Sequence, residues 1–431
     1  MPWLAVAISM QATGASAISF MAIPAKSYAT DLLYYGAALF SILGVLLIAF
    51  FFFPIYHKLR LISIYEYLGK RFSPALRFAG GGVFVVMEIC ARASIVMLLP
   101  AMALSAVTGI NLYLAIILMA VFATVYTTLG GIEAVIWSDV LQFIIMVGGA
   151  MLCLVLMIFK VDGGIAGIWQ TALEYDKLNM YDWSWDPAVV AIGYVVISRF
   201  SQQLQKLSNQ AEMQRPLCTG SIKDAKKAII GQWIIWVPMG VAWFGLGVVL
   251  FAFFHSQPEM FAPTLPTDTV FPQFIHTQLP VGLSGLMIAA LFAAAMSTLD
   301  SGINSSATVV IHDFYIRFKR EKPSERKVLR MSRRATVIIG LIATLATVIA
   351  ASQRGDTSVW DMFIRMMAIV FGSFPGVFVL GLLTKRGNSA GAICGLFVGM
   401  GAALVLPLFW DIHVLYHGII GLLILYVPVI L

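Results

Sequence analysis

Hydroxyl and acidic side chains gather in one otherwise apolar stretch, LFAAAMSTLDSGINSSATVV, at residues 291–310. Its regularly spaced hydroxyl residues are Ser297, Thr298, Ser301 and Ser305. They recur every three or four residues, so most of them fall on one face of a helix. Asp300 lies about one turn beyond Ser297. Small hydroxyls, a carboxylate and accessible carbonyls are the oxygen ligands that a hard cation requires.

The competing interpretation of this stretch is close helix packing. Alanine and serine let another backbone approach, and a serine hydroxyl can bond back to the carbonyl one turn earlier. Without Asp300 the two interpretations have equal weight. A carboxylate in the middle of an apolar span is costly and indicates function, so we favour a cation site.

A second carboxylate, Asp139, lies in GGIEAVIWSDVLQF, about eight residues into another apolar stretch. One interpretation is an interfacial acid near the cytoplasmic end of a span. The other is a cation ligand, which requires Asp139 to meet the stretch around Asp300. The second interpretation gains weight if Asp139 meets that stretch.

Glu88 and Arg92 are spaced i, i+4, so they lie on one face of a helix. Either the two charges neutralise each other as a buried pair, or Arg92 faces a cavity and binds an anionic group. A guanidinium suits a carboxylate because the two can form a bidentate pair. The spacing alone leaves both interpretations open. Arg199 and Arg365 are further arginines in apolar stretches, without a clear partner.

The elements that position these residues are expected to be membrane-spanning helices. Of the 431 residues, 60% are hydrophobic and 11% are charged, whereas a soluble domain carries about 25% charged residues. Apolar runs of about 20 residues match the length of a helix that crosses the hydrocarbon core. About twelve spans are predicted: 3–25, 32–54, 79–105, 112–129, 132–159, 187–206, 227–254, 281–311, 334–352, 358–383, 388–408 and 412–431.

The charge of the loops predicts the orientation. Loops after even-numbered spans hold about twenty lysines and arginines, and loops after odd-numbered spans hold four. Cytoplasmic loops carry such an excess, so both ends of the chain are expected in the cytoplasm. The same topology accounts for the net charge of +7 and leaves nucleic acid without support as a partner.

Two of the predicted spans are too polar for plain lipid-facing helices. SMQATGASAIS (9–19) is polar and interrupted by glycine, and span 187–206 contains Arg199, Lys206 and three glutamines. Such segments occur at membrane depth only where they face protein or a water-filled cavity. Broken helices at corresponding positions of two halves point to an inverted-repeat transporter with a site near the bilayer midplane.

The expected fold is an all-α polytopic membrane protein with a 5+5 inverted repeat and about two additional C-terminal helices. The repeat is inferred from the order of the spans, because the two halves share no evident residue pattern. The expected division is a first five-helix repeat at 1–160, an external loop at 161–186, a second five-helix repeat at 187–383 and two additional transmembrane helices at 384–431.

With these residues in view, the chain resembles the sodium:solute symporter family, whose members have the LeuT-type inverted-repeat fold. Within the family it is most similar to bacterial sodium/sialic acid symporters, through the first core helix and the third. The motifs that carry the resemblance are GGIEAVIWSDVLQ (130–142), AAAMSTLDSGINSSAT (293–308), SNQAEMQRPL (208–217), ISIYEYLGKRF (62–72), ISFMAIPAKSYATD (18–31) and ARASIV (91–96).

The resemblance implies one or two bound Na⁺ ions and a carboxylated solute. The core sodium site would be held by backbone oxygens of Ala12, Ala15 and Ala294 and by the hydroxyls of Ser297 and Thr298. A second sodium site would be formed by Asp139, Ser297, Asp300 and Ser301. The substrate carboxylate would be bound by Arg92, Ser16 and Ser19.

Three positions depart from the pattern of these relatives, and one is Asn209, which replaces an aspartate common before the glutamine of the QR motif. Asp300 stands where they have serine, which adds a charge to the second site. Ala38 stands where a substrate-contacting glutamine is expected, so the identity of the sugar acid is not fixed by the resemblance.

We therefore expect a sodium-coupled secondary active symporter that imports a small carboxylated solute, with sialic acid (N-acetylneuraminate) as first choice. It is expected to work as a monomer among the lipids of the bacterial inner membrane. The alternative solutes are a neutral sugar, another organic acid or an amino acid. An ion channel is a distant alternative, because the polar residues gather at mid-depth rather than in a continuous stripe. The sequence contains no nucleophile–base arrangement, P-loop or zinc motif, so an enzyme is not expected.

Overall fold

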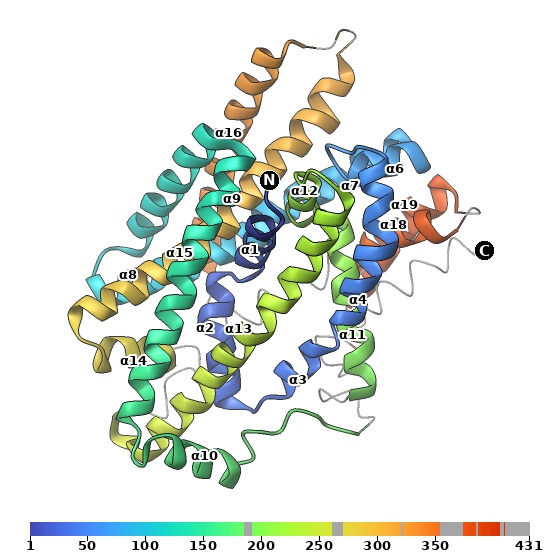
Figure 1. Ribbon diagram of the computed structural model, residues 1–431. Coiled ribbons are helices and arrows are strands. Elements are labelled where there is room, and N and C mark those ends of the chain that lie inside the picture. The colour runs from blue at the N-terminus through green and yellow to red at the C-terminus, as the bar shows by residue number, and fades with distance from the viewer. Residues whose placement is uncertain are drawn as a thin grey trace.

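The computed structural model describes residues 1–184, 192–260, 270–319, 321, 323–353, 374–384, 387–405 and 409. Helices form most of this part of the chain and pack side by side in a bundle (Figure 1). Arg365 and the predicted span 412–431 lie outside the described residues, as does the first part of span 358–383.

Six helical stretches of the described chain are long and apolar enough to cross a membrane. They are Leu33–Lys58, Pro74–Ser105, Leu112–Lys160, Ile222–Ser256, Gly282–Phe318 and Glu325–Gln353. A further span forms if Trp3–Gly14 and Ser19–Ala29, which meet at an angle of 60°, are counted as one broken helix. These stretches agree with the predicted multi-pass architecture and with a break in the first span.

The first part of the chain contains the broken first span and the helices that follow it. They are α1 (Trp3–Gly14), α2 (Ala17–Ala29), α3 (Leu33–Leu39), α4 (Ile42–Leu47), η1 (Ile48–Phe52), α5 (Phe53–Lys58), α6 (Tyr65–Arg71), α7 (Pro74–Met87), η2 (Glu88–Ala93), α8 (Ser94–Thr108), α9 (Leu112–Lys160) and α10 (Gly164–Glu174). Helix η2 is a π-helical segment inside a long span, and such bulges often mark functional sites.

The long helix α9 joins two predicted spans end to end. Gly131 has φ 62° and ψ −167°, a conformation that L side chains rarely adopt. It interrupts the helix between the predicted spans 112–129 and 132–159. Asp139 lies about two turns beyond this interruption.

The second part of the chain supplies the second broken helix and the helices around it. These are α11 (Ile192–Gln205), η3 (Lys206–Ser208), α12 (Gln210–Leu217), α13 (Ile222–Ser256), η4 (Pro258–Met260), α14 (Val270–Gln278), α15 (Val281–Val309), η6 (Val310–Tyr315), η7 (Ile316–Phe318), α16 (Glu325–Gln353), α18 (Phe374–Leu383) and α19 (Ser389–Val405). Helix α15 carries the hydroxyl-rich stretch and packs along α9 and against α1.

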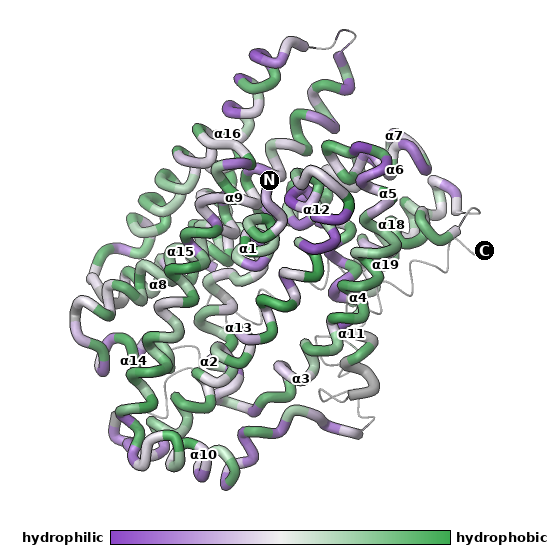
Figure 2. Tube along the Cα trace, in the orientation of Figure 1, coloured by the Kyte–Doolittle hydropathy of each residue, from purple (hydrophilic) through white to green (hydrophobic). Residues whose placement is uncertain are grey.

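Large apolar side chains face outward along α9 and α16. Phe122 is 62% exposed and Leu341 is 66% exposed, and Figure 2 shows hydrophobic residues along both helices. In water such a surface would favour aggregation, whereas hydrocarbon solvates it. Polar residues instead collect on α12 and at loops and helix ends (Figure 2).

Helix α2 lies close to α13 at a glycine. A Cβ atom built on Gly247 would lie 2.3 Å from the carbonyl oxygen of Pro24, so only glycine permits this approach. The Ser27 hydroxyl donates a 2.8 Å hydrogen bond to the Phe244 carbonyl at the same contact. This contact fixes the second half of the broken first span against α13, which also lines the cavity described below.

Candidate sodium and solute sites

The break between α1 and α2 frees backbone carbonyls, and side chains of neighbouring helices satisfy them. Ala15 has φ −90° and ψ 80°, and the next residue is extended, so the helix is interrupted there. The Thr13 carbonyl accepts hydrogen bonds from Arg92 at 2.9 Å and from Thr298 at 3.2 Å. The Met10 carbonyl accepts one from Gln232 at 3.2 Å. Unsatisfied backbone groups are costly at membrane depth, so these side chains stabilise the broken conformation.

The break between α11 and α12 is satisfied in a similar way. The hydroxyls of Tyr56 and Tyr65 donate to the carbonyls of Leu207 and Ser208, at 3.1 and 2.8 Å. Asn209 caps the start of α12. Its side-chain oxygen accepts hydrogen bonds from the backbone amides of Ala211 and Glu212, at 2.9 and 3.3 Å. Side chains of neighbouring helices therefore stabilise the break in each of the two broken helices. The two breaks agree with the prediction that the first and sixth spans are interrupted.

Most members of the predicted core sodium set lie together between α1 and α15. The Ser297 hydroxyl lies 3.0 Å from the carbonyl oxygens of both Ala12 and Ala294. The Thr298 hydroxyl lies 3.5 Å from the same Ala294 oxygen. Ala15 is buried at the break itself. Carbonyl and hydroxyl oxygens are ligands that suit a hard monovalent cation, so the donor set fits Na⁺.

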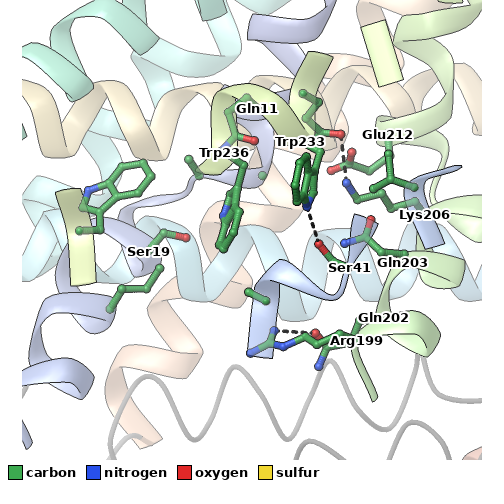
Figure 3. Close-up of a pocket in the computed structure, with 17 residues that line it drawn as sticks. Gln11, Ser19, Ser41, Arg199, Gln202, Gln203, Lys206, Glu212, Trp233 and Trp236 are labelled. Atoms are coloured by element: carbon green, nitrogen blue, oxygen red, sulfur yellow. Dashed lines mark hydrogen bonds between the residues drawn. The ribbon is translucent and has the colours of Figure 1, made fainter. Parts of the chain in front are cut away.

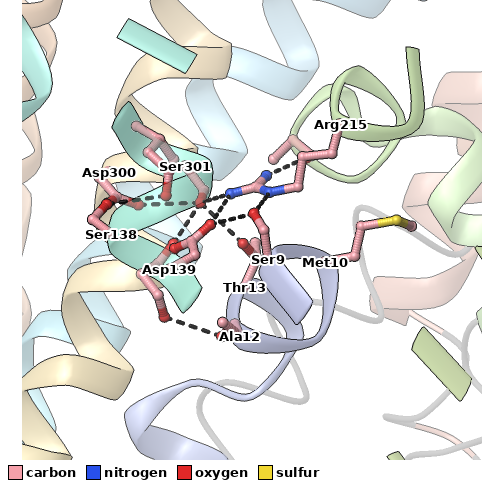
Figure 4. A network of polar contacts seen from close by, with 12 residues as sticks. Ser9, Met10, Ala12, Thr13, Ser138, Asp139, Arg215, Asp300 and Ser301 are labelled. Carbon is pink, nitrogen blue, oxygen red and sulfur yellow. Dashed lines mark hydrogen bonds and ion pairs between the residues drawn. The ribbon is translucent and has the colours of Figure 1, made fainter. Parts of the chain in front are cut away.

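Asp139 forms an ion pair with Arg215. The Arg215 guanidinium lies 2.9 Å from Asp139 Oδ2, and both side chains are buried. Ser9 of α1 donates to the same carboxylate oxygen at 2.5 Å and accepts from Arg215 Nε at 2.7 Å. Arg215 also donates to the Ser301 hydroxyl. Figure 4 shows these side chains converging from α9, α12, α15 and α1.

Asp300 joins this network through hydroxyl groups. Its Oδ2 atom accepts a 2.8 Å hydrogen bond from the Tyr126 hydroxyl, and its Oδ1 atom lies 3.2 Å from the Ser301 hydroxyl. The same Ser301 hydroxyl is 3.0 Å from that of Thr13. Asp300 is fully buried and forms no ion pair within 4.0 Å in the described part of the chain. Asp139 and Asp300 are therefore linked through Arg215 and Ser301, and a shared cation stays a prediction.

Arg215 is a central residue of this polar network that reasoning from the sequence missed. It lies in the motif SNQAEMQRPL, but no partner was assigned to it. Its side chain is 1% exposed, and a buried guanidinium requires a carboxylate. A strongly polar run inside an apolar chain was the available signal for such a residue.

Arg92 is paired in this conformation. Its guanidinium donates to Glu88 Oε1 at 3.0 Å and to the Thr13 carbonyl at 2.9 Å. Both interacting side chains are buried, and a Cβ atom on Gly302 would lie 2.7 Å from Glu88 Oε1. The geometry thus realises the buried-pair interpretation. The binding of a substrate carboxylate by Arg92 stays a prediction.

A cavity of about 220 Å³ opens between the two broken helices and α13. Its lining residues include Gln11, Ser19, Ala38, Arg199, Gln202, Gln203, Lys206, Glu212, Gln232, Trp233, Trp236 and Trp243. Figure 3 shows the polar side chains of α11 on one wall and tryptophans of α13 beside them. Of the predicted solute ligands, Ser19 lines this cavity, whereas Ser16 and Arg92 are not among its described lining residues.

A model of the sodium:solute symporter family matches residues 1–399, which is most of the chain. The chain belongs to this family. The symporter is 32% identical to the sodium/sialic acid symporter SiaT of Proteus mirabilis, over 97% of this chain and 85% of that protein.

Solved structures agree with this assignment. The symporter is similar to a Na⁺-coupled sialic acid symporter in a substrate-bound, outward-open state, with a TM-score of 0.92 and 30% identity over 100% of this chain and 89% of that one. Mhp1, a nucleobase-cation-symport-1 family transporter, has the same fold with a TM-score of 0.62 at 13% identity, over 99% of this chain and 91% of Mhp1.

These matches confirm several predictions made from the sequence. The protein is a multi-pass membrane transporter with the LeuT-type all-α fold, and it couples transport to sodium. It is a symporter and not an enzyme. The division into repeats and the assignment of individual residues to ions and solute stay predictions.

Proposed function

We propose that this symporter imports a sialic acid with Na⁺, using the cavity between the two broken helices. The observation that carries the proposal is the position of this cavity, which is lined by Gly14, Ala15 and Ser19 of the first break and by Lys206 and Glu212 of the second. Sites of this kind lie near the bilayer midplane, where alternating access exposes them to each side in turn. The names of the relatives supply the class of solute.

In this proposal the core Na⁺ is bound by Ala12, Ala15, Ala294, Ser297 and Thr298. The support is the close approach of oxygen atoms from α1 and α15, which lie 3.0 Å apart at Ser297. An ion bound there would replace hydrogen bonds between the two helices by shared coordination. It would thereby fix the broken α1 in one position relative to α15, which couples sodium binding to the shape of the cavity.

A second Na⁺ is assigned to Asp139, Ser297, Asp300 and Ser301. The support is a charge count: two carboxylates and one guanidinium, all buried, leave one negative charge when both acids are ionised. Charges at membrane depth require compensation. Because Arg215 already neutralises Asp139, the added cation would lie on the side of Asp300.

The solute carboxylate is assigned to Ser16, Ser19 and Arg92. Ser16 precedes α2 and Ser19 lies in its first turn, where backbone amides and the helix dipole favour an anion. Arg92 donates to the carbonyl of Thr13, three residues before Ser16, so it adds positive charge close to that helix terminus. A guanidinium has five N–H donors, and the two hydrogen bonds to Glu88 and Thr13 leave others for a ligand.

The remaining assignments follow from this mode of action. The repeats at 1–160 and 187–383 would move against each other, with residues 161–186 outside the cell and 384–431 as added helices. The excess of basic residues in alternate loops supports cytoplasmic termini in a bacterial inner membrane. We further propose that the symporter works as a monomer among lipids and binds no nucleic acid.

Counter-flow uptake in proteoliposomes tests the proposal. In each assay, proteoliposomes that contain the purified protein would be loaded with one unlabelled solute, N-acetylneuraminate or another member of a panel. They would then be offered the same solute in labelled form, with Na⁺ or with K⁺ outside. We expect Na⁺-dependent uptake of N-acetylneuraminate above that of a neutral sugar, a short organic acid and an amino acid. Faster uptake of one of those three solutes would identify that solute, and not sialic acid, as the substrate.

A further inference from the structure

Several polar atoms on the wall of the cavity are buried and have no hydrogen-bond partner in the described part of the chain. They are Glu212 Oε2, Gln203 Oε1 and Trp243 Nε1. Buried polar groups are almost always paired, and an exception points to a water, an ion or a ligand. Three such atoms around one cavity indicate a binding surface whose partners come from a ligand.

Lys206 adds a charged donor to this surface. Its ammonium donates to the neutral Gln232 Oε1 at 3.0 Å, and it forms no ion pair within 4.0 Å among the described residues. An ammonium has three N–H donors, so capacity remains. Lys206 and Glu212 lie on the same wall (Figure 3), yet they do not complete an ion pair with each other.

Helix dipoles account for the presence of both charges, but they do not account for the hydrogen-bonding capacity that the two side chains leave unused. Glu212 is in the first turn of α12, where the helix dipole stabilises a carboxylate. Lys206 follows the C-terminus of α11, where the dipole stabilises a cation. Neither effect supplies a hydrogen-bond donor to Glu212 Oε2. This oxygen is buried, and Glu212 as a whole is 6% exposed.

The chemistry of the ligand follows from the mixture of acceptors and donors. Glu212 and Gln203 offer oxygen acceptors, whereas Lys206 and Trp243 offer N–H donors. A carboxylate can only accept hydrogen bonds, so it satisfies half of this set. A hydroxyl group both donates and accepts, and neighbouring hydroxyls can satisfy all four.

We propose that Lys206 and Glu212, with Gln203 and Trp243, bind hydroxyl groups of the solute. The Lys206 ammonium donates to a hydroxyl oxygen, and a hydroxyl hydrogen is donated to Glu212 Oε2. Trp233 and Trp236 line the same cavity and offer apolar faces to the C–H groups of a sugar. This inference rests on the proposed function and deepens it, because it makes a polyhydroxylated acid the preferred solute over a simple monocarboxylate.

Direct binding of ligands to the parent protein gives the first test. Calorimetry in saturating Na⁺ would compare N-acetylneuraminate with an analogue that lacks the hydroxylated side chain but keeps the carboxylate. We expect the truncated analogue to bind about 10- to 100-fold more weakly, the range for hydrogen bonds to charged groups. Equal binding of the two ligands would overturn the inference without affecting Na⁺-coupled uptake of the sugar acid. If the parent protein bound neither ligand, the proposed function itself would fail.

Substitutions then assign the effect to residues. Glu212→Gln keeps the shape but removes the charge, and Lys206→Met removes the ammonium. Each variant should bind N-acetylneuraminate about 10-fold or more weakly and discriminate less between the two ligands, with its Na⁺ dependence unchanged. Lys223→Met, an exposed position on α13 outside the cavity, is the matched control and should change nothing. Unchanged discrimination in both cavity variants would show that other groups read the hydroxyls. If either variant fails to fold, Lys206→Gln and the ligand comparison on the parent protein still decide the question.

Discussion

The guanidinium of Arg215 lies 2.9 Å from the carboxylate of Asp139, although 76 positions separate the two residues in the chain. Their side chains are 1% and 0% exposed. Ser9 bonds to both partners, so the pair joins α12 of the second broken helix to α9 and to α1. A movement that parts α12 from α9 must separate two buried charges, which is costly. The pair therefore links rearrangement of the helices to charge compensation near the proposed second sodium site.

Removal of one partner of this pair is expected to destabilise the protein strongly. Asp139→Asn or Arg215→Gln alone leaves a buried charge unpaired, which costs about 3–5 kcal/mol. The double variant should cost less than the sum of the two, by about 0.5–3 kcal/mol. Thermal unfolding in detergent measures all three. Arg77→Gln breaks the separate pair with Asp313 and serves as control, since its effect should add to that of Asp139→Asn. Additive effects of Asp139→Asn and Arg215→Gln would argue against their coupling.

The hydroxyls of Ser297 and Thr298 are expected to set the sodium requirement. The double variant Ser297→Ala/Thr298→Ala removes two of the five proposed oxygen ligands. The Na⁺ concentration for half-maximal uptake should rise about 10-fold or more, by analogy with hydrogen bonds to charged groups. Ser305→Ala removes a buried hydroxyl from the same helix, one that bonds to the Gly302 carbonyl at 3.1 Å, and should leave the Na⁺ titration unchanged. A double variant with the parent titration would remove the two hydroxyls from the site.

The carboxylate of Asp300 is expected to determine whether a second ion binds. Asp300→Ser retains one side-chain oxygen, as a hydroxyl, but removes the negative charge that attracts the cation. A Hill coefficient cannot exceed the number of sites, so the coefficient for Na⁺ should fall from about two toward one. Sodium titrations of uptake measure this. Glu174→Gln, which neutralises an exposed acid at the end of α10, should leave the coefficient unchanged. A coefficient that stays near two in Asp300→Ser would remove Asp300 from the second site.

Local sequence features predicted which candidate residues lie together on one helix, because those features depend on spacing within that helix. The hydroxyl repeat of α15 and the i, i+4 pair of Glu88 and Arg92 both appear in the structure as expected. The interruption at Gly131 also lies between two predicted spans. In each of these cases, residues close in sequence determine the geometry.

The relationships that the sequence did not reveal depend on packing between distant helices. Arg215 reaches Asp139 and Ser301 only because α12 lies beside α9 and α15. The contact of Arg92 with α1 depends on the break between α1 and α2, since its partner is the carbonyl of Thr13 near that break. No periodicity in a single sequence encodes these distances. The resemblance to the family supplied the grouping of Asp139 with Asp300, but not the arginine between them.

Lys177, which follows α10 in the chain, is expected to stabilise the end of α2. Its ammonium donates to the carbonyls of Tyr28 and Thr30, both at 2.7 Å, and lies 4.0 Å from the Phe251 ring centroid. Lys177→Met should lower the free energy of unfolding by about 1–3 kcal/mol, since charged hydrogen bonds and a cation–π contact are lost. Thermal unfolding measures the change. Lys160→Met alters an exposed lysine that bonds only to Gln278 in the described chain and is the control. An equal loss in both variants would indicate a general effect of charge.

The two possible roles of Arg92 predict different results for conservative variants. If its guanidinium only supports the break through Glu88 and Thr13, Arg92→Lys and Glu88→Gln should destabilise the protein by similar amounts. Gly302→Ala should do the same, because its added Cβ atom would lie 2.7 Å from Glu88 Oε1.

If Arg92 also binds the solute carboxylate, its replacement should affect ligands unequally. Lysine cannot reproduce the bidentate fork of a guanidinium, so Arg92→Lys should bind N-acetylneuraminate far more weakly than the parent protein does. The methyl ester of N-acetylneuraminate should be bound equally by the two proteins. Glu88→Gln leaves the guanidinium in place and frees it from its partner, so this variant should keep the preference for the acid. Calorimetry with the acid and the ester on all three proteins, together with their unfolding temperatures, separates stability from recognition. We expect the parent to prefer the acid by about 10-fold or more, which corresponds to at least one charged hydrogen bond. Equal binding of acid and ester by the parent would exclude a carboxylate contact altogether and favour a neutral sugar as the solute.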